Sequence, residues 1–105
     1  MIRIGDSEFP SRTAESVLAQ TRGHMFRLSE PDYALVFPFD SVARRWFHML
    51  FVPFDLTIVF VVDDEVTYVQ KLKAWSGTAA DECDLVVELP AGEHDIEVGE
   101  EVSLE

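Results

Sequence analysis

The stretch WFHMLFVPFDLTIVFVV, residues 46–62, is apolar at all but four of its positions and must therefore form the floor of the hydrophobic core. Pro53 divides it in two, because a proline cannot donate a backbone hydrogen bond inside a sheet. After Pro53, apolar residues alternate with Asp55 and Thr57, and the last five residues are apolar on both faces. This pattern predicts a strand over Phe54–Val62 that passes from half-buried to buried on both sides.

Outward from this strand, polar turns separate further short apolar runs. Asp63-Asp64-Glu65 stands before a returning strand over Val66–Leu72, which predicts a hairpin. Pro38 confines the apolar run Tyr33–Phe39 to a sheet edge or ends it there. Other short strands are predicted at Ile2–Ile4, Arg45–Val52, Leu85–Leu89 and Glu101–Leu104, with a loop or single turn at Asp40–Arg44 and a loop at Ser76–Glu82.

Only one segment has the spacing of an amphipathic helix. Ser11 is the expected N-cap, and from Arg12 to Arg22 apolar residues recur every three or four positions on one face. Gly23 suits the left-handed position just past the last turn. One helix near residues 12–22 with six or seven strands predicts a mainly β (α+β) single domain over residues 1–105. We expect a curled antiparallel sheet or a partly closed β-barrel.

The charge balance is the strongest property of the composition. Twenty acidic residues stand against eight basic ones, which gives a formal net charge of −12, and only Lys71 and Lys73 are lysines. This charge repels nucleic acid and anionic lipid, so we expect neither as a partner. An acidic surface poor in lysine is typical of a protein from a high-salt cytoplasm, where salt screens the self-repulsion. An ordinary acidic protein is the alternative.

The sequence lacks the signatures of export, membrane insertion and several enzyme classes. Its first residues show no basic region followed by a long apolar one, and Pro53 and Asp55 interrupt residues 46–62, so we predict a soluble cytoplasmic protein. No glycine-rich phosphate loop, paired-cysteine motif, His-Glu-x-x-His motif or Gly-x-Ser-x-Gly elbow is present, and we expect no cofactor and no metal. Cys83 is the single cysteine, and its acidic neighbours should raise its thiol pKa.

Trp46, His48 and Asp55 are the best candidates for chemistry. In an extended segment Trp46 and His48 lie on the same face. In the functional interpretation, an Asp–His pair beside an aromatic wall binds a small polar ligand or performs acid–base work. In the structural interpretation, Asp55 accepts backbone hydrogen bonds at the Pro53 bend, His48 is half-exposed and Trp46 lies in the core.

Arginine and glutamate side chains supply a second set of candidates. Arginines retained in so acidic a chain suit bidentate pairing with carboxylates. We expect Arg27–Asp55 or Arg22–Glu88 as internal salt bridges; in the alternative, one guanidinium binds an anionic ligand. The candidate binding residues are therefore Arg22, Arg27, Trp46, His48, Asp55 and Glu88.

Blocks of residues spread from Ala14 to Val102 share a further pattern. RGHMFR at residues 22–27 follows the predicted helix, a Trp precedes P-F-D at residues 53–55, and ELPAG occupies residues 88–92. In this order the blocks resemble the R-G-L-M-F-R, W-M-K-N-T, P-L-D and E-L-P-A-G motifs of the DUF192 (UPF0127) family of small uncharacterised proteins. The resemblance implies a mostly β, barrel-like fold with one helix and supplies no established activity. Residues 47–50 replace the family's M-K-N-T, so a site built on its Lys, Asn and Thr is altered or absent. The charge balance indicates a halophilic member.

Three functions are compatible with these observations. Our first hypothesis is a non-enzymatic binding domain with a groove near Trp46, Asp55 and Arg27 for a small molecule or peptide, because aromatic and charged groups coincide there without a nucleophile–base pair. The second is a small hydrolase or lyase with Asp55 and His48 as acid and base. The third is an accessory subunit with an exposed apolar protein interface. We therefore predict a binding protein rather than an enzyme.

Overall fold

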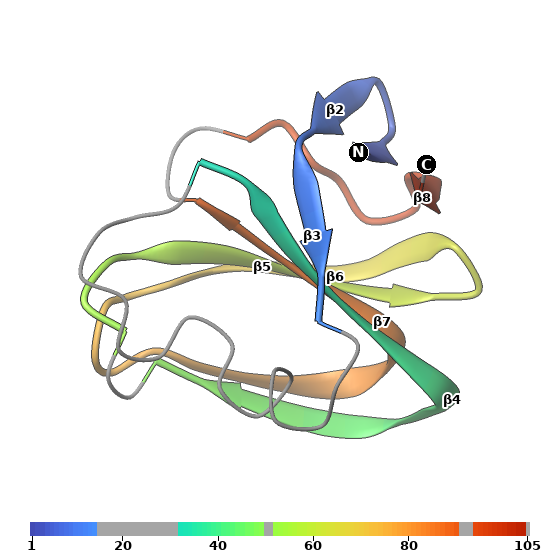
Figure 1. Ribbon diagram of the computed structural model, residues 1–105. Coiled ribbons are helices and arrows are strands. Elements are labelled where there is room, and N and C mark those ends of the chain that lie inside the picture. The colour runs from blue at the N-terminus through green and yellow to red at the C-terminus, as the bar shows by residue number, and fades with distance from the viewer. Residues whose placement is uncertain (15–31, 50–51, 91–93, 105) are drawn as a thin grey trace.

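The chain folds into two β-sheets, as seen in a computed structural model that describes residues 1–14, 32–49, 52–90 and 94–104. The strands are β1 Ile2–Ile4, β2 Ser7–Phe9, β3 Ser11–Thr13, β4 Ala34–His48, β5 Leu56–Val62, β6 Glu65–Leu72, β7 Thr78–Pro90 and β8 Val102–Leu104. The larger sheet has the order β3-β4-β7-β5-β6 and the smaller one β2-β1-β8 (Figure 1). Among these strands only β3 and β4 pair in parallel.

The two longest strands, β4 and β7, bend sharply while staying paired. Their register shifts between Pro38 and Ala43, where residues 39–42 of β4 lie opposite Asp84 alone on β7. Extra residues on one strand of a pair make that strand bend and twist. Beyond this bulge, residues 43–48 of β4 pair with residues 78–83 of β7 and form what we call the distal ribbon. Figure 1 shows it running beneath the rest of the larger sheet.

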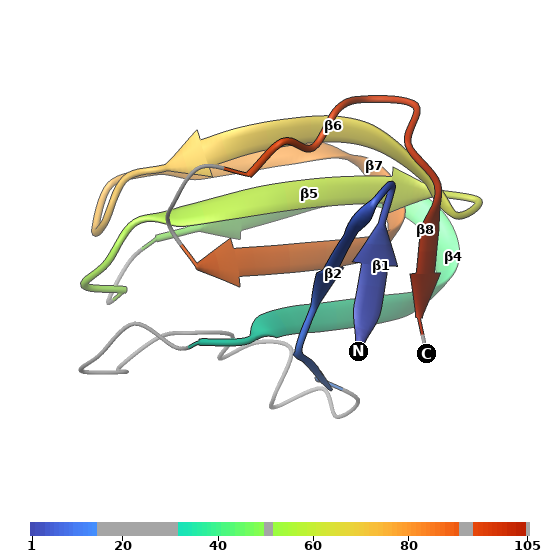
Figure 2. The same cartoon turned by 90° about the horizontal axis from the view of Figure 1, so that it is seen from above.

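One apolar core lies between the two sheets. The smaller sheet, which crosses one face of the larger one in Figure 2, contributes Ile2, Ile4 and Val102. These side chains pack against small aliphatic residues of the larger sheet, among them Val59 and Val87. Ile2 and Ile4 are fully buried, as the alternation of Ile2-Arg3-Ile4 predicts for a strand with one covered face.

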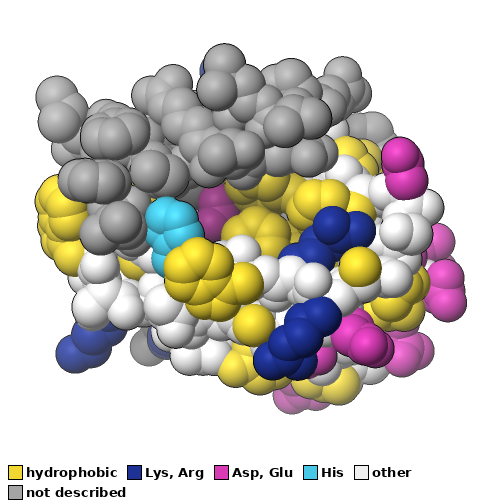
Figure 3. All heavy atoms as spheres, turned by 90° about the horizontal axis from the view of Figure 1, so that it is seen from below, with side chains coloured by type: hydrophobic (Ala, Val, Ile, Leu, Met, Phe, Trp, Pro, Cys, Tyr) yellow, Lys and Arg dark blue, Asp and Glu magenta, His cyan; other side chains and the backbone are white. Residues whose placement is uncertain are grey.

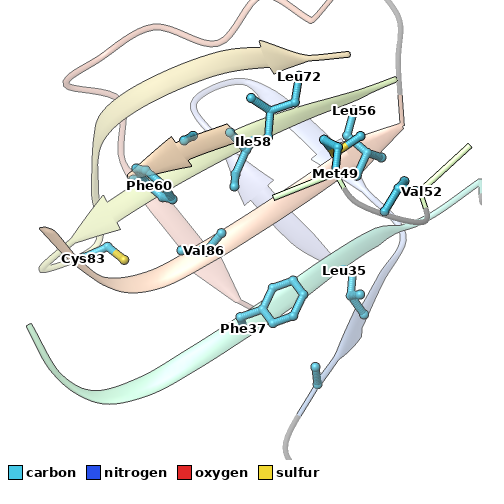
Figure 4. Packing of buried hydrophobic residues seen from close by; sticks show 12 residues of the cluster. Leu35, Phe37, Met49, Val52, Leu56, Ile58, Phe60, Leu72, Cys83 and Val86 are labelled. Carbon is cyan, nitrogen blue, oxygen red and sulfur yellow. The ribbon is translucent and has the colours of Figure 1, made fainter. Parts of the chain in front are cut away.

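A second, more aromatic core lies on the opposite face of the larger sheet, inside the bend of β4 and β7. Phe37, Phe60 and Val86 are buried there, together with Met49 (Figure 4). Phe47 reaches this core from the distal ribbon, with its ring centroid 5.6 Å from that of Phe37 and 5.9 Å from that of Phe60. The larger sheet is therefore buried on both faces.

The predicted hairpin after β5 is confirmed. Asp63 and Asp64 form its turn with φ values of 50° and 63°, and Val62 pairs with Glu65 across it. Aspartate tolerates this left-handed conformation better than most residues, and two such residues give the turn that matches the twist of a hairpin. The division of residues 46–62 at Pro53 is also confirmed, since β4 ends at His48 and β5 begins at Leu56.

Several expectations are corrected. The helix predicted near residues 12–22 does not begin at Ser11, because Ser11–Thr13 form β3 and pair with residues 34–36 of β4. Residues 15–22 of that prediction lie outside the described residues. The barrel is wrong as well: among the described strands, β3 and β6 stand at opposite ends of the larger sheet and do not pair. The loops predicted at Asp40–Arg44 and Ser76–Glu82 are largely strand, within β4 and β7.

Within the described part of the chain, no helix is long and apolar enough to cross a membrane.

The core between the sheets yields a stability prediction. Replacing Ile4 by Ala should lower the free energy of unfolding by about 2–5 kcal/mol, because the side chain is fully buried and its removal leaves a cavity. Leu104→Ala, on a side chain that is 49% exposed in the same small sheet, is the matched control and should cost much less. Urea unfolding of both variants measures the difference. Equal losses would show that the smaller sheet does not pack on the larger one through Ile4.

Candidate functional site

Trp46 and His48 project from the outer face of the distal ribbon. Successive strand residues point to opposite faces, so Phe47 enters the aromatic core while its two neighbours face away from it. Trp46 is 64% exposed, and its ring centroid lies 5.0 Å from that of His48. The prediction that these two residues share a face is confirmed. The interpretation that placed Trp46 in the core is wrong, because Phe47 occupies the inner position of the alternation.

The strand opposite contributes further side chains to this outer face. The β4–β7 register sets Arg44 opposite Glu82, Trp46 opposite Ala80 and His48 opposite Thr78, and we call these six residues the Trp46 face. Because Ala80 is small, nothing on the neighbouring strand covers the indole from the side. Figure 3 looks onto the lower side of Figure 1 and shows a histidine beside a hydrophobic side chain, with basic side chains close by. The face therefore offers an aromatic surface within a polar frame.

Arg44 and Arg45 follow each other in β4 but have different roles. The Arg45 guanidinium lies 3.7 Å from the ring centroid of Phe39, and its Nη2 donates a hydrogen bond of 2.9 Å to the carbonyl oxygen of Ser41. Both contacts are inside the bulge of β4, so Arg45 stabilises the bend. Arg44, the neighbouring residue, points to the opposite side of the strand and is exposed on the Trp46 face. Sequence reasoning did not separate the two.

Asp55 lies immediately before β5 and connects two turns. Its exposed carboxylate accepts a hydrogen bond of 2.8 Å from the backbone N–H of Ala74, in the turn after β6. The N–H of Trp75 donates to the carbonyl oxygen of Val52, at 3.0 Å, beside it. The carboxylate thus accepts from a backbone N–H, as the structural interpretation expected, but the donor is in another turn and not in the bend at Pro53.

Asp55 and His48, both described residues, do not form an acid–base pair. The hydrogen bond of Asp55 goes to Ala74, and no hydrogen bond or ion pair joins it to His48. The ring of His48 instead lies beside that of Trp46 on the distal ribbon, tilted by 42° to it. The two residues belong to different ends of the segment that Pro53 divides. Arg22 and Arg27, the remaining basic candidates, lie outside the described residues.

Glu88 is the single buried carboxylate among the described residues. It is 5% exposed in β7, between Leu35 and Ile58 on the neighbouring strands, and it shares the aromatic side of the sheet with them. Burial removes water from the charged form and raises the pKa of Glu88 from its ordinary value of 4.5 to about 8. Glu88 lies in the half of β7 that follows the bend and pairs with β5, apart from the Trp46 face.

Cys83 and the metal-binding side chains offer no alternative centre. Burial, with smaller contributions from Asp84 and Asp81, raises the pKa of the Cys83 thiol to about 11, although nearby Arg45 lowers it. The expected direction is thus confirmed, but burial and not the acidic neighbours is its main cause. Within the described ranges, no group of three or more His, Cys, Asp and Glu side chains is placed to hold a metal ion.

Sequence reasoning missed half of the Trp46 face. Thr78, Ala80 and Glu82 lie in the segment that was predicted to be a loop, and their small and polar side chains carry no strand pattern. They are extended because β4 pairs with them from thirty or more positions away in the sequence. Only the alternation of Trp46 and His48 with Phe47 could have indicated this face.

The pKa of Glu88 gives a testable pH dependence. Between pH 4.5 and about 8 the unfolded chain ionises Glu88 while the folded chain keeps it protonated, so the free energy of unfolding falls as pH rises. Glu88→Gln, which cannot ionise, should remove up to about 1.4 kcal/mol of this loss per pH unit. Glu82→Gln, on an exposed position of the same strand, is the control and should keep the slope. Urea unfolding across this pH range measures it; an unchanged slope in Glu88→Gln would show that Glu88 is ionised in the fold.

Two solved structures share the fold of this chain, and the profile of one family matches its sequence. A crystal structure of a protein of unknown function from Novosphingobium aromaticivorans DSM 12444 has a TM-score of 0.82 and 22% identity, over 98% of this chain and 83% of that one. A crystal structure described as "a putative transcription regulator" from Sinorhizobium meliloti 1021 has a TM-score of 0.81 and 17% identity, over 97% of this chain and 90% of that one. At these identities the similarity shows the fold alone.

None of the curated proteins is similar to this sequence. The profile of DUF192, a family described as uncharacterised, matches residues 1–104, which is nearly the whole chain. With the order of its sequence blocks, this match shows that the chain belongs to the DUF192 family.

Proposed function

We propose that this chain is a non-enzymatic binding domain and that the Trp46 face is the centre of its binding surface. The observation that carries the proposal is that Trp46 is 64% exposed on a ribbon whose other face packs Phe47 against the aromatic core. Tryptophan has a large apolar body and one hydrogen-bond donor, and it is enriched where proteins bind one another. Covering the exposed part of this indole would contribute on the order of 3 kcal/mol to binding.

The form of the face favours an extended peptide or a protein surface as its ligand. A two-stranded ribbon presents side chains on a plane, and Trp46 stands between Arg44 and His48 of the same strand. Such an arrangement suits a partner that lies along the strands, with an apolar residue on the indole and polar groups on either side. The exposed carboxylate of Asp55, which accepts a hydrogen bond from the backbone N–H of Ala74, is a further polar group in the turn before β5.

The charge of the molecule narrows the class of partner. A net charge of −12 disfavours nucleic acid and anionic membranes, both of which need basic surface. The separation of Asp55 from His48 supports binding over hydrolysis or elimination, since general acid–base work needs both groups near one substrate. An extended peptide or a protein surface with an apolar group to cover the indole of Trp46 is the partner that this surface suits best.

We also propose that the protein works in a high-salt cytoplasm. Among the described carboxylates, Glu88 alone is buried, and most of the others are exposed. This distribution makes the surface strongly anionic, so mutual repulsion opposes the compact state until salt screens it.

The binding proposal predicts where ligands will act. In a titration of 15N-labelled protein with a library of short neutral peptides, the indole N–H of Trp46 and the amides of the distal ribbon should shift most. Trp46→Ala should abolish these shifts. Trp75, which is 54% exposed in the turn after β6, provides an internal control because its indole should not respond. Shifts that centre on Trp75, or that persist in Trp46→Ala, would place the binding surface elsewhere; shifts with small polar molecules alone would change the ligand class.

The salt proposal predicts a rise in thermal stability with KCl. The unfolding midpoint should increase steadily between low and molar KCl, because screening removes repulsion among exposed carboxylates. Sucrose at matched viscosity is the control for effects that do not depend on charge. Differential scanning calorimetry measures both series, and equal midpoints at low and molar KCl would contradict the proposal.

A further inference from the structure

We propose that the partner of the Trp46 face is the same face of a second copy of this chain, related by a twofold axis parallel to the strands of the distal ribbon. This inference rests on the proposed binding function and names its partner. Homo-oligomers most often use such isologous contacts, in which one patch meets itself. The requirement is that the patch be complementary to its own rotated image.

The register of the distal ribbon meets this requirement. A twofold axis that runs between two stacked ribbons, parallel to their strands, places β4 of one copy over β7 of the other at the same height. Each residue of one copy then faces, in the other copy, the equivalent of the residue that it pairs with in its own chain. The facing pairs between copies are therefore Arg44 with Glu82, Trp46 with Ala80 and His48 with Thr78.

Each of these contacts is complementary in charge or size. A guanidinium faces a carboxylate, the largest side chain faces the smallest, and an imidazole faces a hydroxyl group. Stacked sheets lie about 10 Å apart, so Arg44 and Glu82 can reach each other across the gap while Ala80 leaves room for the indole of Trp46. The rotation thus places the indole of Trp46 over the small side chain of Ala80 in the second copy.

The other simple twofold arrangement is poorer. An axis in the same plane but perpendicular to the strands would set Trp46 against Trp46 and Arg44 against His48 of the second copy. Two large rings would then hold the sheets apart, and Glu82 would face Thr78 without a cation. The pairing of opposite charges therefore selects the parallel axis.

The size and charge of the face set the strength of the dimer. Six side chains are far fewer than the roughly 20–30 residues per side of a standard protein interface, so we expect a weak dimer in equilibrium with monomer. The net charge of −12 on each copy also opposes association. Ionic strength must be held constant in any comparison, because salt screens this repulsion and the contact between Arg44 and Glu82 alike.

A charge-swap mixing experiment tests the arrangement. Sedimentation velocity over a concentration series should show wild-type protein passing from monomer to dimer. Arg44→Glu places two carboxylates face to face and Glu82→Arg two guanidinium groups, so each variant alone should dimerise at least about tenfold more weakly. An equimolar mixture of the two variants restores both ion pairs and should recover the wild-type dimer. Lys71→Glu and Glu97→Arg make the same charge changes at exposed positions outside the face and should leave dimerisation unchanged.

A size swap gives an independent reading in case the charge variants fail to fold. Trp46→Ala and Ala80→Trp should each dimerise weakly, the first through a gap and the second through a clash, and their mixture should recover the dimer. Wild-type protein that stays monomeric, single variants that behave as wild type, or mixtures no more dimeric than their components would each overturn the second-copy proposal. If the Trp46 indole still responds to peptides in that case, the binding function stands; if it does not respond, both proposals fail.

Discussion

The bend that β4 and β7 share is the constraint on which the rest of the structure depends. It arises where residues 39–42 of β4 lie opposite Asp84 alone, and it turns the distal ribbon under the larger sheet. Pro38 lies at the start of the bend. It comes two residues after Val36, which is the last residue of β4 that pairs with β3. A proline at this point interrupts no ladder on that side. Arg45 then stabilises the bend from within, through Phe39 and the carbonyl oxygen of Ser41.

This bend also determines which side chains reach solvent. It brings Phe47 onto Phe37 and Phe60, which closes the aromatic core. Successive side chains of a strand point to opposite faces. Because Phe47 points into the core, Trp46 and His48 must point to solvent. A large indole is thus held on the surface by the same alternation that fills the core. Glu88, in the other half of β7, is buried for the complementary reason, since it faces the side that the ribbon covers.

The sequence predicted the elements whose cause is local. The hairpin at Asp63 and Asp64 follows from turn chemistry, and the break at Pro53 follows from the missing backbone donor. Where pairing with a distant strand decides the conformation, local reasoning was wrong. Ser11–Thr13 have the pattern of a helix start but pair with β4, and residues 78–82 have the composition of a loop but pair with it too. Tertiary pairing overrides weak local propensity in both cases.

The sequence by itself determined the apolar floor, the family, the acidic surface and the shared face of Trp46 and His48, because each follows from composition, residue order or the period of a strand. The tertiary structure decided which side of that strand meets the core, what stands opposite Trp46, and that Asp55 bonds to Ala74 rather than to His48. These outcomes depend on the bulge between Pro38 and Ala43 and on pairings across long separations in the chain. A one-residue change of register would exchange the two faces of the ribbon, and the packing of Phe47 against Phe37 and Phe60 opposes it.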